Sequence, residues 1–230
     1  METEAYQALS SKSRQDILRL LHRKRMSVEE IAQELKLQPI TIRHHLQSLV
    51  QAGFIEAAQE RANSVGRPRI LYNMVRDPPL ISYPKRGYLM LSTSLINALR
   101  STLQEKKANE ILRKAGLEMG ESVVKRLESE HDNRSWSIKT YEQLFVRDYL
   151  EQMGAEPEVV EVSDKGLVYR LHNCLFFELS LKMPEIMCAI LHESFHEGLA
   201  KAMGSTMKVD RSSCLSKGDP YCEHTCALIE

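Results

Sequence analysis

Hydrophobic residues near the start of the chain recur with the period of an α-helix. Within residues 12–24 the apolar positions fall on one side of a helical wheel. Such spacing is typical of an amphipathic helix that buries one face and leaves the other in water. We therefore predict a helix here, with its inner face formed by Ile17, Leu18, Leu20 and Leu21.

Two shorter helices are predicted to follow. Ser27 is followed three residues later by Glu30, which is the arrangement of a capping box at the start of a helix. Pro39 suits the first turn of the next helix and Gly53 suits its end. Two short helices joined by about three residues form a helix-turn-helix. The expected buried positions are Val28, Ile31, Ala32 and Leu35, then Ile42, Leu46, Leu49 and Val50.

A β-hairpin is predicted after Gly53. The chain runs as a strand from Phe54, turns through the polar residues 62–66 and returns through a basic strand that begins near Arg67. Helices followed by such a hairpin form a winged helix, whose wing is the hairpin. We assign residues 1–76 to a winged helix-turn-helix domain.

Paired prolines mark the end of this domain. Pro78 and Pro79 end any helix or central strand, so we assign residues 77–90 to a linker and 91–230 to a second domain. Helical periodicity and strand alternation both occur there, which predicts an α+β fold. Helices are expected near 92–128, 139–153 and 184–203, and strands near 159–171, 206–209 and 223–228. The apolar stripes of the first helical region are Leu95, Ile96, Leu99 and Leu103, then Ile111, Leu112, Ala115, Met119, Val123 and Leu127.

Charge distinguishes the two domains. The chain has 31 basic and 31 acidic side chains and a formal net charge of zero. Met1–Arg76 nevertheless carries 12 basic against 8 acidic side chains, so the remainder has a net charge of −4. No apolar run approaches the roughly 20 residues of a membrane span, and the first residues lack the layout of a secretory signal. We expect a cytoplasmic protein with no membrane partner and a basic first domain.

The outward side of the helix that begins at Pro39 is rich in hydrogen-bonding groups and has no acidic residue. Such a helix suits the major groove of double-stranded DNA, where side chains contact phosphates and base edges. The alternative is an ordinary solvated helix face. Arginines of the hairpin are positioned to enter a minor groove. The candidate DNA-binding residues are Gln38, Thr41, Arg43, His44 and Gln47 on the helix, and Arg61, Arg67 and Arg69 on the wing.

Residues 5–75 resemble the winged-helix domain of the arsenical-resistance (ArsR) class of bacterial and archaeal repressors. The stretches that carry the resemblance are Leu9–Leu18, Ile40–Gly53 and Gly66–Arg69. The resemblance implies a homodimer on a palindromic operator, with Thr41, Arg43 and His44 on the recognition helix. The first domain has no cysteine, so the thiol metal site of some relatives is absent from it.

All five cysteines lie in the last 57 residues. In a reducing cytosol, such clustering indicates metal or redox chemistry more than a disulfide framework. Four thiolates from separate segments can enclose tetrahedral zinc or an iron–sulfur cluster. The alternative is that they are small buried hydrophobic residues. The candidate ligands are Cys174, Cys188, Cys214 and Cys222, with Cys226, His172, His192, His196 or His224 as substitutes.

Residues 100–230 resemble the 4-vinyl reductase-type sensor domain. Its mark is Cys-x7-Cys around Gly-Asp-Pro, here Cys214 to Cys222. Zinc-binding members also take a cysteine from a preceding helix, which Cys188 matches, and an acidic residue three positions before the cysteine of the turn. Arg211 stands at that position, so the zinc pattern is incomplete.

The whole chain resembles the Suf-type regulators of iron–sulfur cluster biogenesis, which join an ArsR-like winged helix to a region of spaced cysteines. This resemblance implies a non-enzymatic regulator, typically a repressor, whose iron–sulfur cluster controls operator binding, and Cys174 would replace the missing acid. One alternative is a regulator with a structural zinc site and a small organic effector. Another is a thiol enzyme that uses Cys222 or Cys226, although no paired acid and base or orienting partner is evident.

Overall fold

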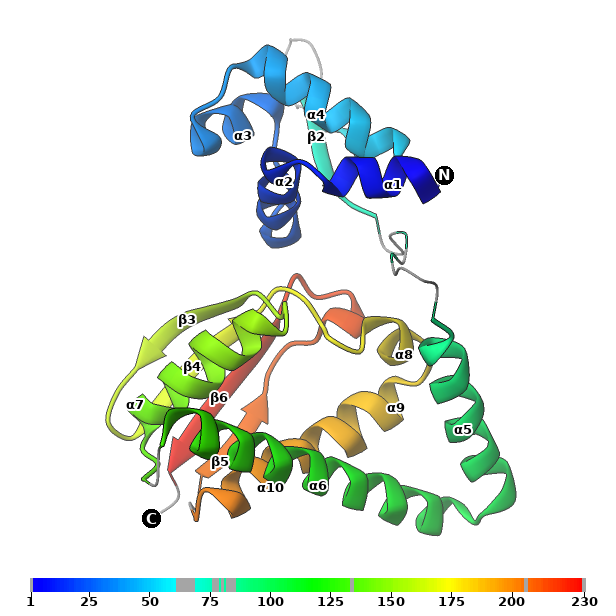
Figure 1. Cartoon of the computed structure of the whole chain (residues 1–230), viewed down its shortest axis with the longest axis vertical. Helices are drawn as coiled ribbons and strands as arrows, with labels where there is room; N and C mark the ends of the chain where they lie inside the picture. Colours follow the sequence, from blue (N-terminus) through cyan, green and yellow to red (C-terminus); the bar gives the residue numbers. More distant parts are fainter. Residues whose placement is uncertain are drawn as a thin grey trace. The chain divides into compact units, whose positions relative to one another are not determined.

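The computed structural model describes residues 2–60, 69–75, 79, 81, 86–132, 135–204 and 207–228. The chain divides into two compact units, Met1–Arg86 and Gly87–Glu230 (Figure 1). The first is a helix-turn-helix with a hairpin and the second mixes helices with an antiparallel sheet, so the predicted α+β class is confirmed. Much of the predicted linker lies outside the described residues.

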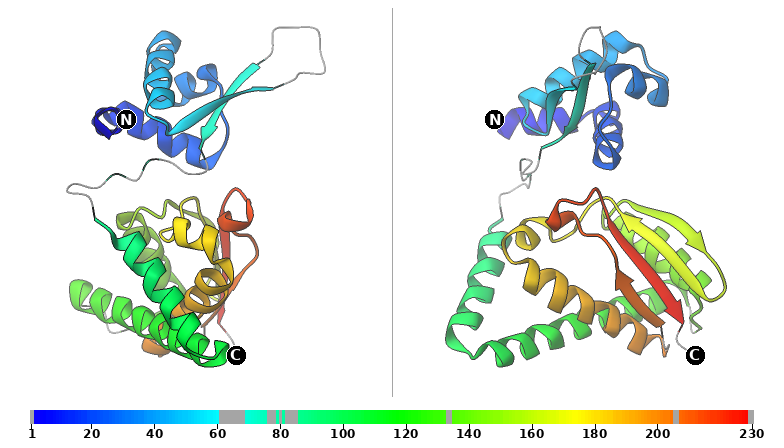
Figure 2. Two further views of the ribbon diagram at one scale, coloured as in Figure 1. Left: turned by 90° about the vertical axis from the view of Figure 1, so that its right-hand side faces the viewer. Right: turned by 180° about the vertical axis from the view of Figure 1, so that it is seen from behind.

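The first unit places four helices before a two-stranded hairpin. The strands pair antiparallel from Ile55 opposite Met74 to Glu60 opposite Arg69. Figure 2 shows these strands extending away from the helices. The elements are α1 (Glu2–Leu9), α2 (Lys12–Arg23), α3 (Val28–Leu35), α4 (Pro39–Gln51), β1 (Ile55–Glu60) and β2 (Arg69–Met74).

Local sequence signals set the bounds of these helices. Both halves of the predicted capping box form, because the Ser27 hydroxyl accepts from the Glu30 backbone N–H and the Glu30 carboxylate accepts from the Ser27 N–H. Pro39 is the first residue of α4, and Gly53 follows this helix with a φ of +78°. A positive φ is unfavourable for residues with a side chain, so glycine ends the helix at little cost.

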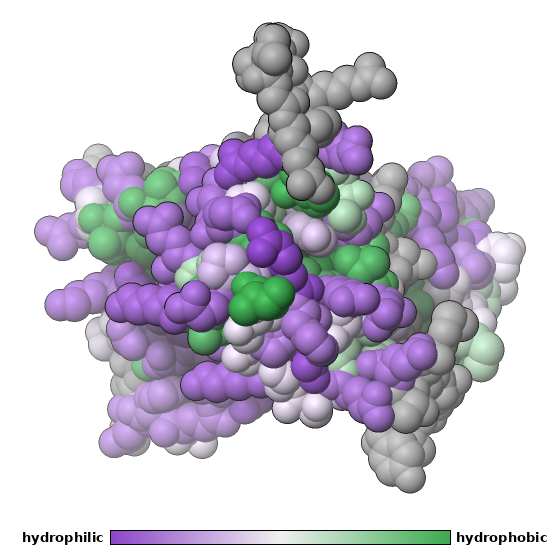
Figure 3. Space-filling view, turned by 90° about the horizontal axis from the view of Figure 1, so that it is seen from above, coloured by the Kyte–Doolittle hydropathy of each residue, from purple (hydrophilic) through white to green (hydrophobic). Residues whose placement is uncertain are grey.

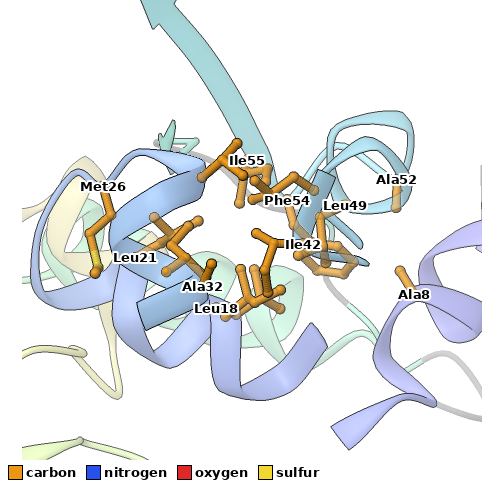
Figure 4. Close-up of a cluster of buried hydrophobic side chains, with 14 of the residues drawn as sticks. Ala8, Leu18, Leu21, Met26, Ala32, Ile42, Leu49, Ala52, Phe54 and Ile55 are labelled. Carbon is orange, nitrogen blue, oxygen red and sulfur yellow. The ribbon is translucent and has the colours of Figure 1, made fainter. Parts of the chain in front are cut away.

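A single apolar cluster holds the first unit together (Figure 4). Most predicted inner positions of the helices are buried in it. Val50 was predicted to point inward but is 40% exposed, because it lies at the edge of the stripe that Ile42, Leu46 and Leu49 form on α4. The remaining described members of this stripe are fully enclosed, so α4 has one firmly packed side and one free side.

The second unit is built on a four-stranded antiparallel sheet in the order β3-β4-β6-β5. Three helical segments between Pro184 and Ala202 follow one another without a break, as predicted. The elements are α5 (Tyr88–Thr102), α6 (Glu105–His131), α7 (Ile138–Thr140), the π-helix η1 (Tyr141–Leu150), β3 (Pro157–Val162), β4 (Gly166–Leu171), α8 (Phe177–Lys182), α9 (Pro184–Ile186), the π-helix η2 (Met187–Leu191), α10 (His192–Ala202), β5 (Met207–Arg211), the 3-10 turn η3 (Leu215–Lys217) and β6 (Cys222–Leu228).

The core of the second unit lies between the sheet and the helices. Leu167 and Tyr169 of β4 are fully buried and belong to the same cluster as Val124 of α6, Phe145 of η1 and Leu199 of α10. Because neighbours across an antiparallel ladder point to the same side, alternate residues of β6 face this helical layer too. The sheet and helices therefore place β6 side chains directly against α10.

The apolar stripe predicted for α6 is partly wrong. Ile111 and Met119 are 43% and 38% exposed, and the buried side includes Gly116 and Gly120 instead. A Cβ on Gly120 would lie 2.7 Å from the Leu199 backbone nitrogen of α10, closer than packed atoms allow. Glycine is thus the residue that lets the two helices approach, and a hydrophobicity pattern does not count glycine as buried. Leu95 of α5 is also exposed, at 61%.

Within the described part of the chain, no helix combines the length and the apolar character that crossing a membrane requires.

Candidate functional site

The candidate nucleic-acid surface is the free side of α4. Every residue predicted there for DNA binding is exposed, whereas His45 on the same helix is half-buried and burial lowers the pKa of its imidazole. In the space-filling view from above, most of the visible surface is hydrophilic, with small hydrophobic areas between (Figure 3). The exposed set is Gln38, Thr41, Arg43, His44 and Gln47.

Two of the predicted arginines already have carboxylate partners on α3. Arg43 donates to Glu29 at 3.0 Å, and Arg69 lies 2.8 Å from a carboxylate oxygen of Glu30 while donating to the Ser27 hydroxyl at 3.1 Å. The ion pairs are exposed, so each is worth roughly 0–1 kcal/mol and can be exchanged for phosphate contacts. No pattern along α4 or β2 indicates these pairs, because the carboxylates come from α3.

The other wing positions, Arg61 and Arg67, lie outside the described residues.

The four candidate cysteine ligands line one small cavity of about 70 Å³ in the second unit. Cys174 precedes α8, Cys188 lies on the π-helix η2, Cys214 precedes η3 and Cys222 begins β6. Cys188, Cys214 and Cys222 form one buried cluster, and Cys174 is half-buried. The fold therefore brings together side chains that are up to 48 positions apart in the sequence.

The turn before β6 has a conformation that aims Cys214 into this cavity. Gly218 takes a φ of +95°, which favours glycine, and the adjacent Asp219 carboxylate accepts from the Cys214 backbone N–H at 2.7 Å. Leu215 donates its backbone N–H to the Cys222 sulfur at 3.3 Å. These bonds explain why the Gly-Asp-Pro sequence stands between the two cysteines.

The sulfurs of Cys188 and Cys214 lie 3.8 Å apart. Two thiolates on one tetrahedral zinc at about 2.3 Å each would be about 3.8 Å apart, so this pair has the spacing of ligands to a single metal atom. The Ser216 hydroxyl lies 3.1 Å from the Cys214 sulfur and 3.5 Å from that of Cys188. With Cys174 on the same cavity wall, the donor set fits a site with four thiolates.

The cysteine thiols differ in acidity. Burial works to raise the pKa of Cys214, but hydrogen bonds from Ser216 and the charge of Arg211 outweigh it, and the pKa is lowered. Burial raises the pKa of Cys222 to about 12 and raises that of Cys174. Cys214 is therefore the most readily ionised of these three, and a thiolate is the form that binds metal.

Arg211 stands where the zinc pattern of the 4-vinyl reductase-type domain has an acidic residue, and it makes different contacts. One of its nitrogens donates to the Cys188 backbone oxygen at 3.3 Å and to Nδ1 of His192 at 3.1 Å. A guanidinium has no lone pair to offer a metal. Arg211 instead places a positive charge beside the cysteines, which favours thiolates.

Cys226 lies apart from the cavity. It is fully buried in the main core, and burial raises the pKa of its thiol to about 12. His172 also has a separate role, because its Nε2 lies 2.8 Å from the Glu158 carboxylate. Three other histidines named as substitute ligands lie together between α10 and β6, with ring nitrogens within 4.8 Å of one another: His192, His196 and His224.

A larger apolar cavity, of about 700 Å³, lies against α6. Side chains of α6, η1 and α10 contribute Met119, Tyr149 and Phe195, and the segment before α8 contributes Leu175 and Phe176. Its size is in the range of pockets that bind small organic molecules.

Two separate stretches of the chain match known protein families. Residues 9–57 match a helix-turn-helix domain family, which confirms the helix-turn-helix prediction and its DNA-binding class. A search of the curated proteins finds no match to this chain.

Two solved structures are similar at low identity. Trafficking protein particle complex subunit 3 from Naegleria fowleri, covalently bound to palmitic acid, is 15% identical, with a TM-score of 0.47 over 61% of this chain and 92% of that chain. The phenol-responsive sensory domain of the transcription activator PoxR, solved with phenol, is 13% identical, with a TM-score of 0.45 over 82% of this chain and 90% of that chain.

A second family model matches residues 85–225, which is more than half of the chain and includes the whole sheet except its last residues. By this match, the chain belongs to the L-2-amino-thiazoline-4-carboxylic acid hydrolase family.

Proposed function

We propose that this protein is a homodimeric transcription regulator that binds a double-stranded DNA operator and carries a cysteine-ligated iron–sulfur cluster in its second domain. The observation that carries the proposal is the convergence of Cys174, Cys188, Cys214 and Cys222 on one cavity, in a chain whose first domain is a helix-turn-helix. Neither feature alone distinguishes a sensor from an ordinary DNA-binding or metal-binding protein.

The first domain supports the DNA-binding half of the proposal. The free side of α4 carries donors and acceptors without a carboxylate, and Arg43 can leave its exposed partner Glu29 for a guanine or a phosphate. The wing residues Arg61, Arg67 and Arg69 would add contacts in the adjacent minor groove. A symmetric dimer would place two recognition helices about one DNA turn apart, which matches a palindromic operator.

The surface of α5 supports the proposed homodimer. Tyr88, Met90, Leu91 and Leu95 are each more than half exposed on this helix. Large apolar side chains gathered on one helix mark a surface that another protein covers. A second copy of the chain would cover this surface and would give the dimer the two-fold symmetry of a palindromic operator.

The four cysteines would hold the cluster by their thiolates, and Arg211 would compensate part of the negative charge that four thiolates bring. When bound, such a cluster supplies one-electron chemistry and sensitivity to oxidation. Cys188 lies on η2, which runs without a break into α10, and α10 packs closely on α6. Ligation of Cys188 on η2 would therefore shift α10 and, through it, α6, which follows the proposed dimer helix α5. Such a shift would change the spacing of the two DNA-binding domains in the dimer.

The test combines metal analysis with operator binding. Protein prepared without oxygen should contain iron and acid-labile sulfide, and its affinity for operator DNA should change when the cluster is removed. Arg43→Ala should weaken specific binding in both states, whereas Cys214→Ser should leave the binding of the apo-protein intact and abolish the response. Cys226→Ala is the matched control, because this cysteine lies in the core and should not be needed for iron. Equal affinity with and without the cluster would refute the switching function.

A second candidate is a regulator with structural zinc and a small organic effector. The 3.8 Å separation of the Cys188 and Cys214 sulfurs favours it, as does the apolar cavity of about 700 Å³ beside α6. The same preparations separate the two candidates, since a cluster protein is brown and contains sulfide while a zinc protein is colourless. Stabilisation of the zinc protein by a phenol-sized apolar compound would then support the effector site.

We favour a regulator over an enzyme, although the family is described by a hydrolase activity. The thiols of Cys222 and Cys226 have pKa values raised to about 12 by burial, so neither is a ready nucleophile at neutral pH.

A further inference from the structure

Three histidines of the second unit converge beside the proposed cysteine centre, and two of them, His192 and His224, also line its cavity. His192 and His196 lie one turn apart on α10, and His224 faces them from the middle of β6. The Nε2 atoms of His192 and His196 are 3.3 Å apart, and the ring centroids of the three imidazoles are 4.6 to 5.4 Å from one another. The strand register produces this arrangement, because it places His224 opposite Tyr169 and Arg211 on the side that faces α10.

The hydrogen bonding of these rings is incomplete. Nδ1 of His196 and both ring nitrogens of His224 are buried, and none has a hydrogen-bond partner among the residues that the structure describes. His224 stacks on the buried ring of Tyr169 at 4.9 Å and is itself only 1% exposed. A buried polar atom without a partner is costly, and a ring with two such atoms requires an explanation.

Histidine binds metal through the lone pair of its neutral ring. His196 and His224 are buried and His192 is half-buried, and burial disfavours the charged form of an imidazole.

The spacing of the nitrogens fits a single ion. Two imidazole nitrogens bound to tetrahedral zinc at about 2.0–2.1 Å lie about 3.3 Å apart, which is the separation found between His192 and His196. The segment from His192 to His196 also reads His-Glu-x-x-His on a helix, a pattern that presents two zinc ligands on one helical face. A third ligand from another element completes the protein part of an open zinc site, and His224 is placed to supply it.

We propose that His192, His196 and His224 bind one divalent transition-metal ion, preferably zinc, through a ligand set separate from the four cysteines. His192 and His224 also line the cysteine cavity, so the two sites are neighbours. A cavity of about 340 Å³ opens on these three residues and on Glu193 and Arg211. Three protein ligands leave the fourth position of a tetrahedral ion free, so this cavity would hold a metal-bound water or a small anionic ligand. Imidazole ligands also suit nickel and copper, but they do not select magnesium or calcium.

Arg211 connects the histidine site with the cysteine cavity. Arg211 donates to Nδ1 of His192, which then acts as an acceptor and leaves the proton on Nε2. Binding a metal through Nε2 moves that proton to Nδ1, so Arg211 must give up this bond. Its remaining bond is to the backbone oxygen of Cys188, a proposed ligand of the other centre. A metal on the histidines would thereby alter the surroundings of the cysteines.

The first experiment removes the cysteine site and measures zinc uptake by the full chain. In a Cys188→Ser, Cys214→Ser, Cys222→Ser variant that circular dichroism shows to be folded, calorimetric titration with Zn²⁺ should give one equivalent per chain. X-ray absorption of the bound zinc should show nitrogen or oxygen ligands alone, at about 2.0–2.1 Å. A folded variant that takes up no zinc would refute the site, as would a sulfur ligand in the spectrum.

Further variants identify the ligands. His192→Gln and His224→Gln, each in this background, should lose zinc binding, while His172→Gln, which alters a buried histidine outside the triad, should retain it. Glu193→Gln should retain it too. Arg211→Gln should tighten zinc binding by about tenfold, because an amide oxygen can accept from Nδ1 of His192 where a guanidinium cannot.

A final experiment compares the wild-type chain with His192→Gln, so that no cysteine is replaced by serine. The wild-type chain saturated with zinc should hold one more equivalent than His192→Gln, in which this half-buried ring is replaced without touching a cysteine. Equal zinc content in the two proteins, or unchanged binding in His192→Gln and His224→Gln, would overturn the assignment.

Discussion

Replacing Gly120 by alanine tests whether the close contact of α6 and α10 holds the second unit together. A Cβ at this position would lie 2.7 Å from the Leu199 backbone nitrogen and 3.0 Å from the carbonyl carbon of Gly198, and closer still to the Phe195 oxygen. Ordinary contacts of a Cβ begin at about 3.4 Å. The helices must therefore separate by at least about 0.7 Å, because the obstructing atoms belong to the backbone and cannot rotate away.

Two opposing effects determine the expected magnitude. Alanine favours a helix over glycine by about 1 kcal/mol. Against this, an extra methyl group in a packed interior costs about 1–3 kcal/mol, and a gap of 0.5–1 Å between the helices forfeits a quarter to a half of each pairwise attraction along the contact. We take the upper part of this range because all the obstructing atoms are backbone. The net loss in the free energy of unfolding should be about 2 kcal/mol, which corresponds to a fall in Tm of roughly 6 °C.

The chain has a single tryptophan, which makes the assay specific to the second unit. Trp136 packs against the core of that unit and donates to Glu128 at 2.9 Å, so its fluorescence reports the unfolding of that unit within the full chain. Ser122→Ala, at an exposed position of the same helix, is the matched control and should be neutral or slightly stabilising. A Gly120→Ala variant that equals or exceeds the wild type in urea titrations would refute the close-contact interpretation.

Three further predictions concern the first unit. Ser27→Ala removes the hydroxyl cap of α3 and should lower the free energy of unfolding of that unit by about 1 kcal/mol, as measured by circular dichroism. The hydrogen bond from the Ser27 backbone N–H is the main cause that lowers the pKa of Glu30 below 4.5. The ionised Glu30 carboxylate should therefore stabilise the unit fully above pH 4.5, and this stabilisation should be lost as the pH falls further. A Glu30→Gln variant should lack this part of the acid dependence. Glu29→Gln frees Arg43 from an exposed ion pair and should tighten DNA binding by at most about fivefold in fluorescence anisotropy titrations at low salt. Unchanged or weaker binding would show that the ion pair does not compete with DNA.

Where a structural feature depends on neighbours in the sequence, sequence reasoning predicted it well. The capping box at Ser27, the start of α4 at Pro39 and the long helix from Pro184 all form as local rules require. The stripe on α6 was misplaced for the opposite reason. Gly116 and Gly120 are buried by the approach of α10, which no pattern along α6 records.

The candidate sites also combine features set by neighbours in the sequence with features set by the packing of distant segments. The spacing of Cys214 and Cys222 was readable because one turn joins them, but the convergence of Cys174 and Cys188 on the same cavity depends on how separate segments pack. The partners of Arg43 and Arg69 were missed because they lie on another helix. The sequence offers these histidines only as substitute ligands for the cysteine site, since the meeting of His224 with His192 and His196 depends on the register of β6.

Three residues on one side of strand β6 contribute to three different parts of the second unit. Cys222 lines the cysteine cavity, His224 meets the other histidines and Cys226 fills the core, each two positions after the last. Loss or gain of one residue between Cys222 and Cys226 would turn the residues on one side of the change to the opposite face, so the three could no longer share one side of the sheet. The cysteine cavity, the histidine cluster and the core can therefore be altered during evolution by substitution, but not by insertion or deletion between Cys222 and Cys226.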